Sequence, residues 1–281
     1  MLQRIFKHIC ITDLDGTLLD LDHSISDTNM QTLNRLRELQ VCRVAATGRS
    51  LYSLKKVLST DMPFDYVIFS TGAGIMKWQT QSIILAIHIE KKFIRRTFQI
   101  LHKLNVDFMV HAPIPDNHRF VYVKGKGLPD FQRRIGIYEK FAEAYSGDIN
   151  RISEEVTQFL VVADSGEENL YPLLIRELEP LKVIRTTSPL DHHSLWLEIF
   201  APEVDKGTAA RYLLDLLGLN RSNLCVIGND FNDLDMLKMT SYAFVTDNAP
   251  QSLKDAHKVV SDHNHHGFAE AVSIWLAEIN K

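Results

Sequence analysis

The chain has few cysteines, little net charge and no basic surface signal. Its 281 residues include three cysteines, Cys10, Cys42 and Cys225, each set among apolar neighbours. An odd, scattered set of this kind indicates buried reduced thiols rather than a disulfide framework, which fits the cytoplasm. The formal net charge of -4 gives no basic footprint, so nucleic acid is not expected as a partner.

Long apolar runs, low-complexity tracts and internal repeats are also missing from the sequence. The short apolar stretch at the start of the chain runs straight into Asp13 and Asp15. A signal peptide or a membrane span needs a longer uncharged run, so we expect neither, and no membrane partner. A length of 281 residues exceeds the commonest single-domain size and predicts two domains or one domain with a large insertion. The sequence leaves the oligomeric state open.

What is present in the first and last thirds is an alternation of short apolar strands and helical patterns. Such alternation predicts an α/β fold, a Rossmann-like parallel sheet with helices on both faces. The strands are expected at residues 9–12, 41–46, 66–69, 224–227 and 243–245. One helix is expected to start at Ser26 or Asp27, and three others are expected to cover residues 51–58, 207–217 and 233–238.

The middle of the chain has a different character. Alternating segments at residues 108–111, 120–124 and 159–162 accompany amphipathic helices expected at 91–104 and 131–144. We therefore predict an inserted α+β domain over residues 88–192, within a core domain of residues 1–87 and 193–281. Both crossings would lie near the carboxyl ends of the strands, where open α/β sheets bind their ligands.

The first chemically informative segment is Asp13-Leu14-Asp15-Gly16-Thr17, directly after a predicted strand. Residues i and i+2 project to the same side, so two carboxylates converge at the sheet edge, and Gly16 lets the backbone turn away. One carboxylate can be a nucleophile and the other a proton carrier, provided a cation or a proton relieves their repulsion. A solvated Asp-Gly turn explains the same residues if they are taken alone.

Two further segments suit a phosphate group. Thr47-Gly48-Arg49 lies between a predicted strand and a predicted helix. A hydroxyl and free backbone N–H groups at a helix amino terminus bind phosphate oxygens. A plain helix cap explains the same residues. Lys206 opens a helix within Asp205-Lys206-Gly207-Thr208. A cation at a helix amino terminus opposes the dipole, so this lysine makes more sense if it faces an anion.

The fourth segment, Gly228–Asp233, reads Gly-Asn-Asp-Phe-Asn-Asp after a predicted strand. Clustered oxygen donors in a tight loop suit a hard cation such as Mg²⁺, and an Asn/Asp-rich turn is the simpler alternative. The order and context of all four segments, at strand ends or a helix start of one sheet, favour a joint phosphate and metal site.

This ensemble resembles the haloacid dehalogenase superfamily of phosphatases, and the large insertion resembles the cap of its Cof-type branch, which includes many sugar phosphatases. The string Asp-Leu-Asp-Gly-Thr-Leu from Asp13 carries the most specific part of the resemblance. The resemblance implies that Asp13 attacks phosphorus and that Asp15 protonates the leaving oxygen and later activates water. It also implies that Thr47 and Gly48 hold phosphoryl oxygens and that Lys206 steadies the nucleophile.

The resemblance further implies a Mg²⁺ cofactor held by Asp13, by the backbone carbonyl of Asp15 and by the fourth loop, with Asn232 and Asp233 around the ligands. One departure stands out, because the family pattern Gly-Asp-x-x-Asn-Asp places Asn229 where an aspartate is expected. Asparagine can bind through its carbonyl oxygen but adds no charge. We therefore expect Asn229 and Asp230 to share this part of the site, with weaker metal binding.

The substrate implied is a small phosphorylated metabolite, with a phosphorylated sugar suggested by the family alone. Within the insertion, His111, Arg119 and Lys124 are the candidate substrate contacts, although solvated surface charge explains each one singly. Two other functions stay open. A phosphomutase would use the same aspartates and return the phosphoryl group to its substrate, and a non-catalytic phosphometabolite-binding protein would explain Asn229.

Overall fold

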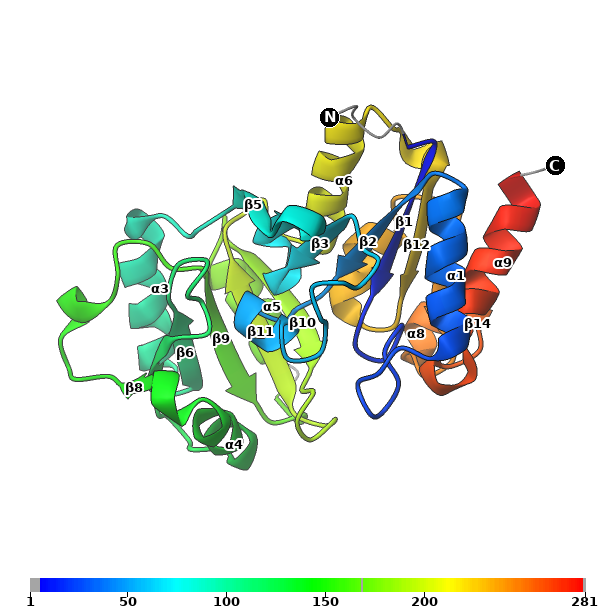
Figure 1. The fold of residues 1–281 in the computed structure, drawn as a ribbon. Coiled ribbons are helices and arrows are strands. Elements are labelled where there is room, and N and C mark those ends of the chain that lie inside the picture. Colours follow the sequence, from blue (N-terminus) through cyan, green and yellow to red (C-terminus); the bar gives the residue numbers. More distant parts are fainter. Residues whose placement is uncertain (1–5, 168, 280–281) are drawn as a thin grey trace. The chain divides into compact units, whose positions relative to one another are not determined.

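The computed structural model describes residues 6–167 and 169–279. Leaving the other residues aside, the chain forms two compact units (Figure 1). The first unit comprises Met1–Arg49, Leu54–Leu85 and Asp205–Lys281, and the second comprises Ser50–Ser53 and Ala86–Val204. Each unit is built around a sheet of its own.

The sheet of the first unit has the strand order β14-β13-β12-β1-β2-β3-β4-β5. Neighbouring strands from β14 to β3 are parallel, and β4 is antiparallel to β3. The strand bounds are β1 His8–Asp13, β2 Val41–Ala46, β3 Tyr66–Phe69, β4 Gly74–Lys77, β5 Ser82–Ala86, β12 Leu224–Gly228, β13 Ala243–Thr246 and β14 Lys258–Val260. The predicted α/β class with a parallel sheet is confirmed.

The centre of this sheet determines where a ligand can bind. Strand β1 pairs with β2 on one side and with β12 on the other, so the chain order reverses at β1. A crevice opens at such a switch point beyond the carboxyl ends of the strands. The segments that follow Asp13, Ala46 and Gly228 therefore meet there.

Helices cover both faces of the first sheet (Figure 1), as the sequence predicts. Ser26 caps α1 by accepting from the backbone N–H of Asn29, and Gly218 ends α6 in the left-handed conformation. Helix α1 packs against α9, and α6 packs against α7. The bounds are α1 Asp27–Glu38, α2 Leu51–Leu54, α6 Lys206–Leu217, α7 Leu234–Leu237, α8 Gln251–Lys254 and α9 Gly267–Ile279.

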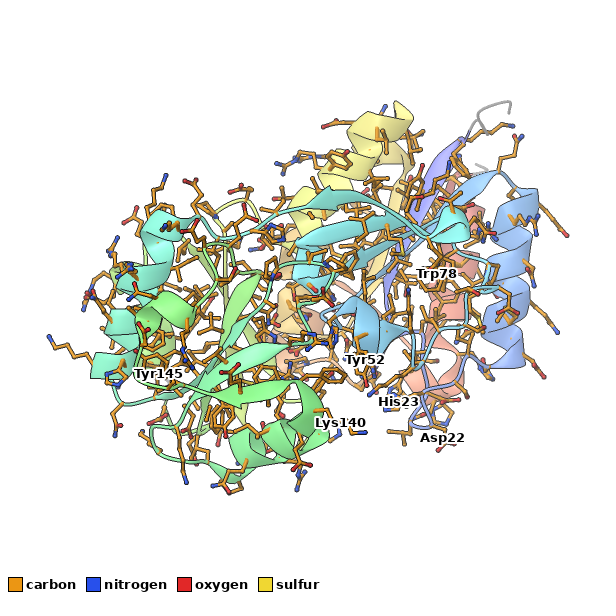
Figure 2. All side chains as sticks on the ribbon, turned by 60° about the vertical axis from the view of Figure 1, so that its left-hand side comes forward. Asp22, His23, Tyr52, Trp78, Lys140 and Tyr145 are labelled. Carbon is orange, nitrogen blue, oxygen red and sulfur yellow. The ribbon has the colours of Figure 1, made fainter. Side chains whose placement is uncertain are left out.

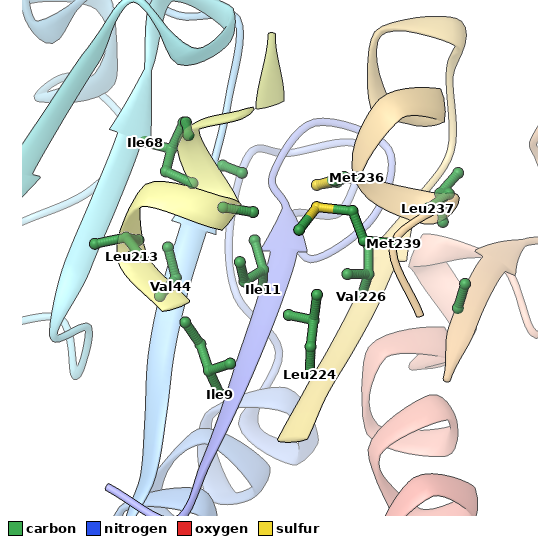
Figure 3. Close-up of a cluster of buried hydrophobic side chains, with 14 of the residues drawn as sticks. Ile9, Ile11, Val44, Ile68, Leu213, Leu224, Val226, Met236, Leu237 and Met239 are labelled. Atoms are coloured by element: carbon green, nitrogen blue, oxygen red, sulfur yellow. The ribbon is translucent and has the colours of Figure 1, made fainter. Parts of the chain in front are cut away.

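The core of the first unit lies between the sheet and helices α6 and α7 (Figure 3). Ile9 and Ile11 of β1 meet Val44 of β2, Val226 of β12 and Leu213 of α6 in one buried cluster. Burying one such aliphatic side chain stabilises the fold by about 1.5–3 kcal/mol. This packing holds β1, β2 and β12 rigidly, and with them the residues that follow.

The thiols lie inside the same unit. Cys10 and Cys225 are register partners on the parallel strands β1 and β12. Both are buried thiols outside any disulfide, and so is Cys42. The prediction of buried reduced thiols is confirmed.

The second unit has a mostly antiparallel sheet in the order β10-β11-β9-β6-β7-β8. Its strands are β6 Asp107–His111, β7 Phe120–Val123, β8 Ala142–Ala144, β9 Gln158–Ala163, β10 Lys182–Thr187 and β11 Leu195–Phe200, and its helices are α3 Lys91–Lys103, α4 Pro129–Ile137 and α5 Leu170–Glu177. Phe98 of α3 packs on Phe108 and Tyr145, with ring centroids 5.2 and 4.8 Å apart; Tyr145 is labelled in Figure 2.

Two predicted helices are shorter than expected. The helix predicted over 131–144 is wrong in its last part, because α4 ends at Ile137 and residues Ala142–Ala144 form β8, which pairs in parallel with β7. Pairing with a sheet edge overrides the helical pattern there. The helix predicted over 51–58 ends at Leu54. No helix in the described part of the chain is long and apolar enough to cross a membrane.

Candidate active site

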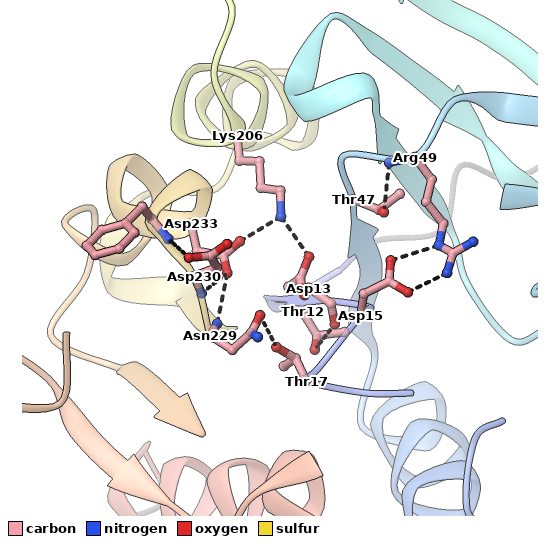
Figure 4. Close-up of polar contacts among 11 residues, drawn as sticks. Thr12, Asp13, Asp15, Thr17, Thr47, Arg49, Lys206, Asn229, Asp230 and Asp233 are labelled. Carbon is pink, nitrogen blue, oxygen red and sulfur yellow. Dashed lines mark hydrogen bonds and ion pairs between the residues drawn. The ribbon is translucent and has the colours of Figure 1, made fainter. Parts of the chain in front are cut away.

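A buried lysine and two aspartates form the centre of the site (Figure 4). Asp13 is the last residue of β1, and Lys206 is the first residue of α6. The Nζ of Lys206, which is 0% exposed, donates to Oδ1 of Asp13 at 2.7 Å and to Oδ1 of Asp233 at 2.6 Å. The lysine that the sequence places at a helix amino terminus therefore faces two anions.

Burial controls the protonation of this centre. Burial, together with the nearby charges of Asp233 and Asp15, raises the pKa of Asp13 to about 8 against the opposing effect of Lys206. Burial alone would lower the pKa of Lys206, but the carboxylates of Asp13 and Asp233 outweigh burial and raise it. Lys206 is therefore charged at neutral pH, and additional positive charge beside Asp13 would favour its anionic form.

Asp233 orders the fourth loop as well as pairing with Lys206. Its second oxygen, Oδ2, accepts from the backbone N–H groups of Asn229 and Asp230 at 2.8 and 3.1 Å. The side chain of Asp230 accepts from the backbone N–H of Phe231 at 2.8 Å and caps the short 3-10 helix Phe231–Asp233. Asp230 thus has a structural task of its own in this loop.

Asp15 is held by a residue of the second motif. The guanidinium of Arg49 binds both carboxylate oxygens of Asp15, Nε to Oδ2 at 2.7 Å and Nη2 to Oδ1 at 2.6 Å. The Nδ1 of His23 lies 3.7 Å from Oδ1 of Asp15. A bidentate pair fixes the orientation of a carboxylate as well as its charge, and the sequence gives no sign of it beyond the presence of an arginine in the motif.

Thr47 and Gly48 lie just beyond the end of β2, as predicted. The Oγ1 of Thr47 accepts from the backbone N–H of Arg49 at 3.1 Å. A Cβ added to Gly48 would lie 3.4 Å from Oγ1 of Thr71 and 3.7 Å from Nδ2 of Asn232. The second motif therefore lies beside the fourth loop and beside Thr71, whose φ of 57° marks a strained backbone.

The oxygen atoms around Asn229 suit a magnesium ion. One end of its side-chain amide lies 3.2 Å from Oδ2 of Asp13, from the backbone oxygen of Asp15 and from Oγ1 of Thr17. A carboxylate, a backbone carbonyl and an amide oxygen are all ligands that Mg²⁺ accepts. Among the described residues, no group of three or more His, Cys, Asp or Glu side chains could hold a metal ion. The donor set of this site therefore depends on the backbone and on Asn229.

The three candidate substrate residues of the insertion lie in the second unit. His111 is buried, with Nδ1 2.8 Å from the backbone oxygen of Asn117. Burial, and then the nearby charge of Arg134, lower the pKa of His111 to about 3, so its imidazole is neutral. Arg119 lies over the ring of Phe141 at 5.3 Å, and Lys124 is an exposed residue after β7.

Comparisons with known proteins agree on one family. A family model described as haloacid dehalogenase-like hydrolase matches residues 10–272. The putative phosphatase YxeH of Bacillus subtilis is 24% identical over 281 residues, covering 95% of this chain and 97% of YxeH. The 5-amino-6-(5-phospho-D-ribitylamino)uracil phosphatase YwtE of B. subtilis is 23% identical over 273 residues, covering 91% of this chain and 93% of YwtE.

Solved structures give the same picture of the fold. The HAD subclass IIB sugar phosphatase BT4131 superimposes with a TM-score of 0.76 at 17% sequence identity. The superposition covers 96% of this chain and 99% of BT4131. The similarity therefore extends over both units.

Proposed function

Because the chain belongs to the haloacid dehalogenase-like hydrolases, we propose that it hydrolyses a small phosphomonoester, a sugar phosphate or a related compound, at the site around Asp13. The family inferred from the four motifs is confirmed, and so is the predicted enzyme class, since its relatives include phosphatases matched over nearly their whole length. The observation that carries the proposal is the contact of Lys206 with Asp13 at 2.7 Å.

Asp13 would act as the nucleophile. A carboxylate oxygen of Asp13 forms a bond to phosphorus while the bond from phosphorus to the ester oxygen breaks. Asp15 acts in this step in its protonated form and gives its proton to the departing oxygen, which leaves as the alcohol. Asp15 then takes a proton from a water molecule that attacks phosphorus in the aspartyl phosphate. The bond between phosphorus and the oxygen of Asp13 breaks, which releases phosphate and restores Asp13.

The other polar residues of the site would position the reacting groups and neutralise their negative charge. Lys206 reduces the charge repulsion between Asp13 and the incoming phosphoryl group, and its own place is fixed by Asp233. The hydroxyl of Thr47 and the backbone N–H of Gly48 would bind phosphoryl oxygens. Arg49 holds the ionised form of Asp15 in one orientation, which is the form that takes a proton from water.

We propose that the enzyme uses Mg²⁺. The residues that would hold it are Asp13, the backbone carbonyl of Asp15 and Asn229, with Asp233 fixing the loop behind Asn229. When bound, the ion would supply positive charge to Asp13 and to the phosphoryl oxygens. The sequence predicts that Asn229 and Asp230 share this part of the site. We favour Asn229 as the ligand, because the carboxylate of Asp230 caps the 3-10 helix.

The second unit would be the cap that selects the substrate. This unit, Ser50–Ser53 and Ala86–Val204, contains the range 88–192 that the sequence predicts as the inserted domain and extends beyond it to residue 204. A sugar or sugar-alcohol phosphate is favoured because YwtE is named for a phosphoribityl compound and BT4131 is named a sugar phosphatase. Arg119 and Lys124 remain candidate contacts, whereas the buried, neutral His111 is better suited to a hydrogen bond than to binding phosphate by charge.

A screen of phosphorylated metabolites tests this function. Wild-type protein with MgCl₂ should release inorganic phosphate from at least one sugar phosphate, and Asp13→Asn should release almost none while staying folded. Isomerised sugar phosphate formed from a hexose 1-phosphate, without free phosphate, would indicate a mutase instead. Thermal stabilisation by phosphorylated compounds, without turnover of any of them or of p-nitrophenyl phosphate, would indicate a binding protein.

A further inference from the structure

Asn229 is held in place on two sides. Its backbone N–H donates to Oδ2 of Asp233 at 2.8 Å, which fixes the start of the loop. On the other side, a Cβ at Gly16 would lie 2.4 Å from Nδ2 of Asn229. The amide therefore lies closely packed between the turn after β1 and the loop after β12 (Figure 4).

The surroundings of the amide restrict which of its two ends can face Asp13. The facing atom lies 3.2 Å from Oδ2 of Asp13, the backbone oxygen of Asp15 and Oγ1 of Thr17. The backbone carbonyl of Asp15 can only accept hydrogen bonds, whatever the protonation of Asp13. In Figure 4, Oδ1 of Asn229 lies on this side, where it accepts from Oγ1 of Thr17 at 3.2 Å and also faces the two acceptors. In the absence of a cation, turning the amide so that its nitrogen faces Asp13 lets it donate to Oδ2 of Asp13 and to the backbone oxygen of Asp15.

The same place also suits the amide oxygen once a cation is present. In an octahedral site with bonds of about 2.0–2.1 Å, adjacent oxygen ligands lie about 2.9 Å apart. The observed separations of 3.2 Å are close to this value. One rotation of the amide thus exchanges two hydrogen-bond donors for a metal ligand, with little movement of the surrounding atoms.

We propose that the side-chain amide of Asn229 has two orientations. In the metal-free protein it donates hydrogen bonds to groups that would otherwise bind the metal, and in the loaded protein it binds the metal itself. In the first state its nitrogen donates to Asp13 and to the carbonyl of Asp15, and in the second its oxygen faces Mg²⁺. This inference rests on the magnesium site of the proposed function. It goes beyond it by predicting a metal-free site that is already satisfied and binds Mg²⁺ weakly.

A change of charge at position 229 tests the proposal through metal binding and stability. An aspartate at position 229 would place a third carboxylate beside Asp13 and Asp233, against the single positive charge of Lys206. Without metal, the added carboxylate would repel Asp13 and could not donate to the carbonyl of Asp15. With metal, it would contribute a full negative charge as a ligand. Asn229→Asp should therefore be less stable than wild type without Mg²⁺ and bind Mg²⁺ more tightly.

The experiment uses MgCl₂ alone, without substrate. Isothermal titration calorimetry gives the dissociation constant, and thermal melts in EDTA and in saturating MgCl₂ give the stability of each state. For Asn229→Asp we expect binding of Mg²⁺ tighter by about tenfold or more. We also expect a lower melting temperature in EDTA and a larger rise on adding MgCl₂. Asn223→Asp, which adds the same charge at the other end of β12, should match wild type in both measurements.

Asn229→Ala separates the two states of the amide. It removes the donor, so it should melt below wild type in EDTA, and it removes the ligand, so it should bind Mg²⁺ more weakly. The proposal is overturned if Asn229→Asp has wild-type affinity and melts at or above the wild-type temperature in EDTA, or if none of the proteins responds to MgCl₂. These results do not depend on turnover, so a failed phosphatase screen with the predicted metal response would reject the function and leave the amide exchange standing.

Discussion

The ammonium group of Lys206 lies 2.7 Å from the carboxylate of Asp13, although 193 residues separate them in the chain. The contact exists because β1 ends at Asp13 and α6 begins at Lys206 on the same edge of the sheet. Both side chains are buried. A buried charge pair between a candidate nucleophile and a lysine is the feature on which the proposed chemistry depends, and the stability of the fold should depend on it too.

Removing the lysine charge should destabilise the protein strongly. Lys206→Met leaves Asp13 and Asp233 buried without their partner, which should lower the free energy of unfolding by about 3–5 kcal/mol. Urea denaturation followed by circular dichroism measures the loss. Lys254→Met is the control, because Lys254 pairs at 3.2 Å with an Asp247 that is 66% exposed, and such a pair contributes about 1 kcal/mol or less. Equal losses for the two variants would contradict the assignment of Lys206 as a paired buried charge.

Arg49 should affect turnover more than substrate binding. Arg49→Lys keeps the charge but cannot bind both oxygens of Asp15 in one plane. We expect kcat to fall by about 10- to 100-fold, in the range typical of losing a well-placed acid–base group, with a smaller change in KM. Steady-state kinetics measure both constants, and Arg176→Lys, an exposed pair with Glu177, is the control. A rise in KM at unchanged kcat would instead make Arg49 a substrate-binding residue.

The turn after Asp13 should tolerate only glycine. Gly16 has a φ of 78°, and a Cβ there would lie 2.4 Å from Nδ2 of Asn229. Gly16→Ala should therefore lower the free energy of unfolding by about 1–3 kcal/mol through backbone strain and this collision. Gly218→Ala, at a φ of 67° with no atom within 4 Å of the added Cβ, isolates the backbone part. Thermal melts of both variants show whether Gly16→Ala costs more, as expected, or the same, which would exclude the collision.

The buried histidine of the second unit should make the protein sensitive to acid. In the folded chain burial lowers the pKa of His111 from 6.5 to about 3. As the pH falls below 6.5, the unfolded chain takes up a proton at His111 and the folded chain does not, so the contribution to stability is lost progressively between pH 6.5 and about 3. At pH 5 the loss is about 2 kcal/mol.

His111→Gln tests this pH dependence. The variant should lose less stability than wild type between pH 7 and pH 5, as measured by urea denaturation at each pH. His102→Gln, on α3, is the control for a histidine substitution in the same unit. Parallel curves for His111→Gln and wild type would show that another group causes the loss in acid.

The sequence predicts the parts of the fold and the site that depend on local pattern. The strands 41–46 and 66–69 have the predicted bounds, because β-branched and aromatic residues between turn residues leave few alternatives. Asp13, Thr47, Lys206 and Asn229 follow from their places at strand ends and a helix start. Their convergence requires only that parallel strands end at one edge.

The sequence does not reveal contacts that depend on which distant segments meet. The strand β8 continues a helical pattern that ran through Phe131, Ile135 and Tyr138, and only its pairing with β7 makes it extended. The bidentate contact of Arg49 with Asp15 joins two motifs 34 residues apart. The second role of Asp233, between Lys206 and the loop, likewise depends on tertiary structure.

The most direct test of the central claim is to trap the phosphoryl group on Asp13. Asp15→Asn removes the group that would activate water, so the intermediate should persist after the protein is mixed with p-nitrophenyl phosphate and MgCl₂ and then quenched in acid. Mass spectrometry of the digested protein should find the mass of one phosphoryl group on the peptide that contains Asp13, and should not find it in Asp13→Asn. A wild-type enzyme that releases phosphate, while Asp15→Asn carries no phosphoryl group or carries it on another residue, would contradict the account.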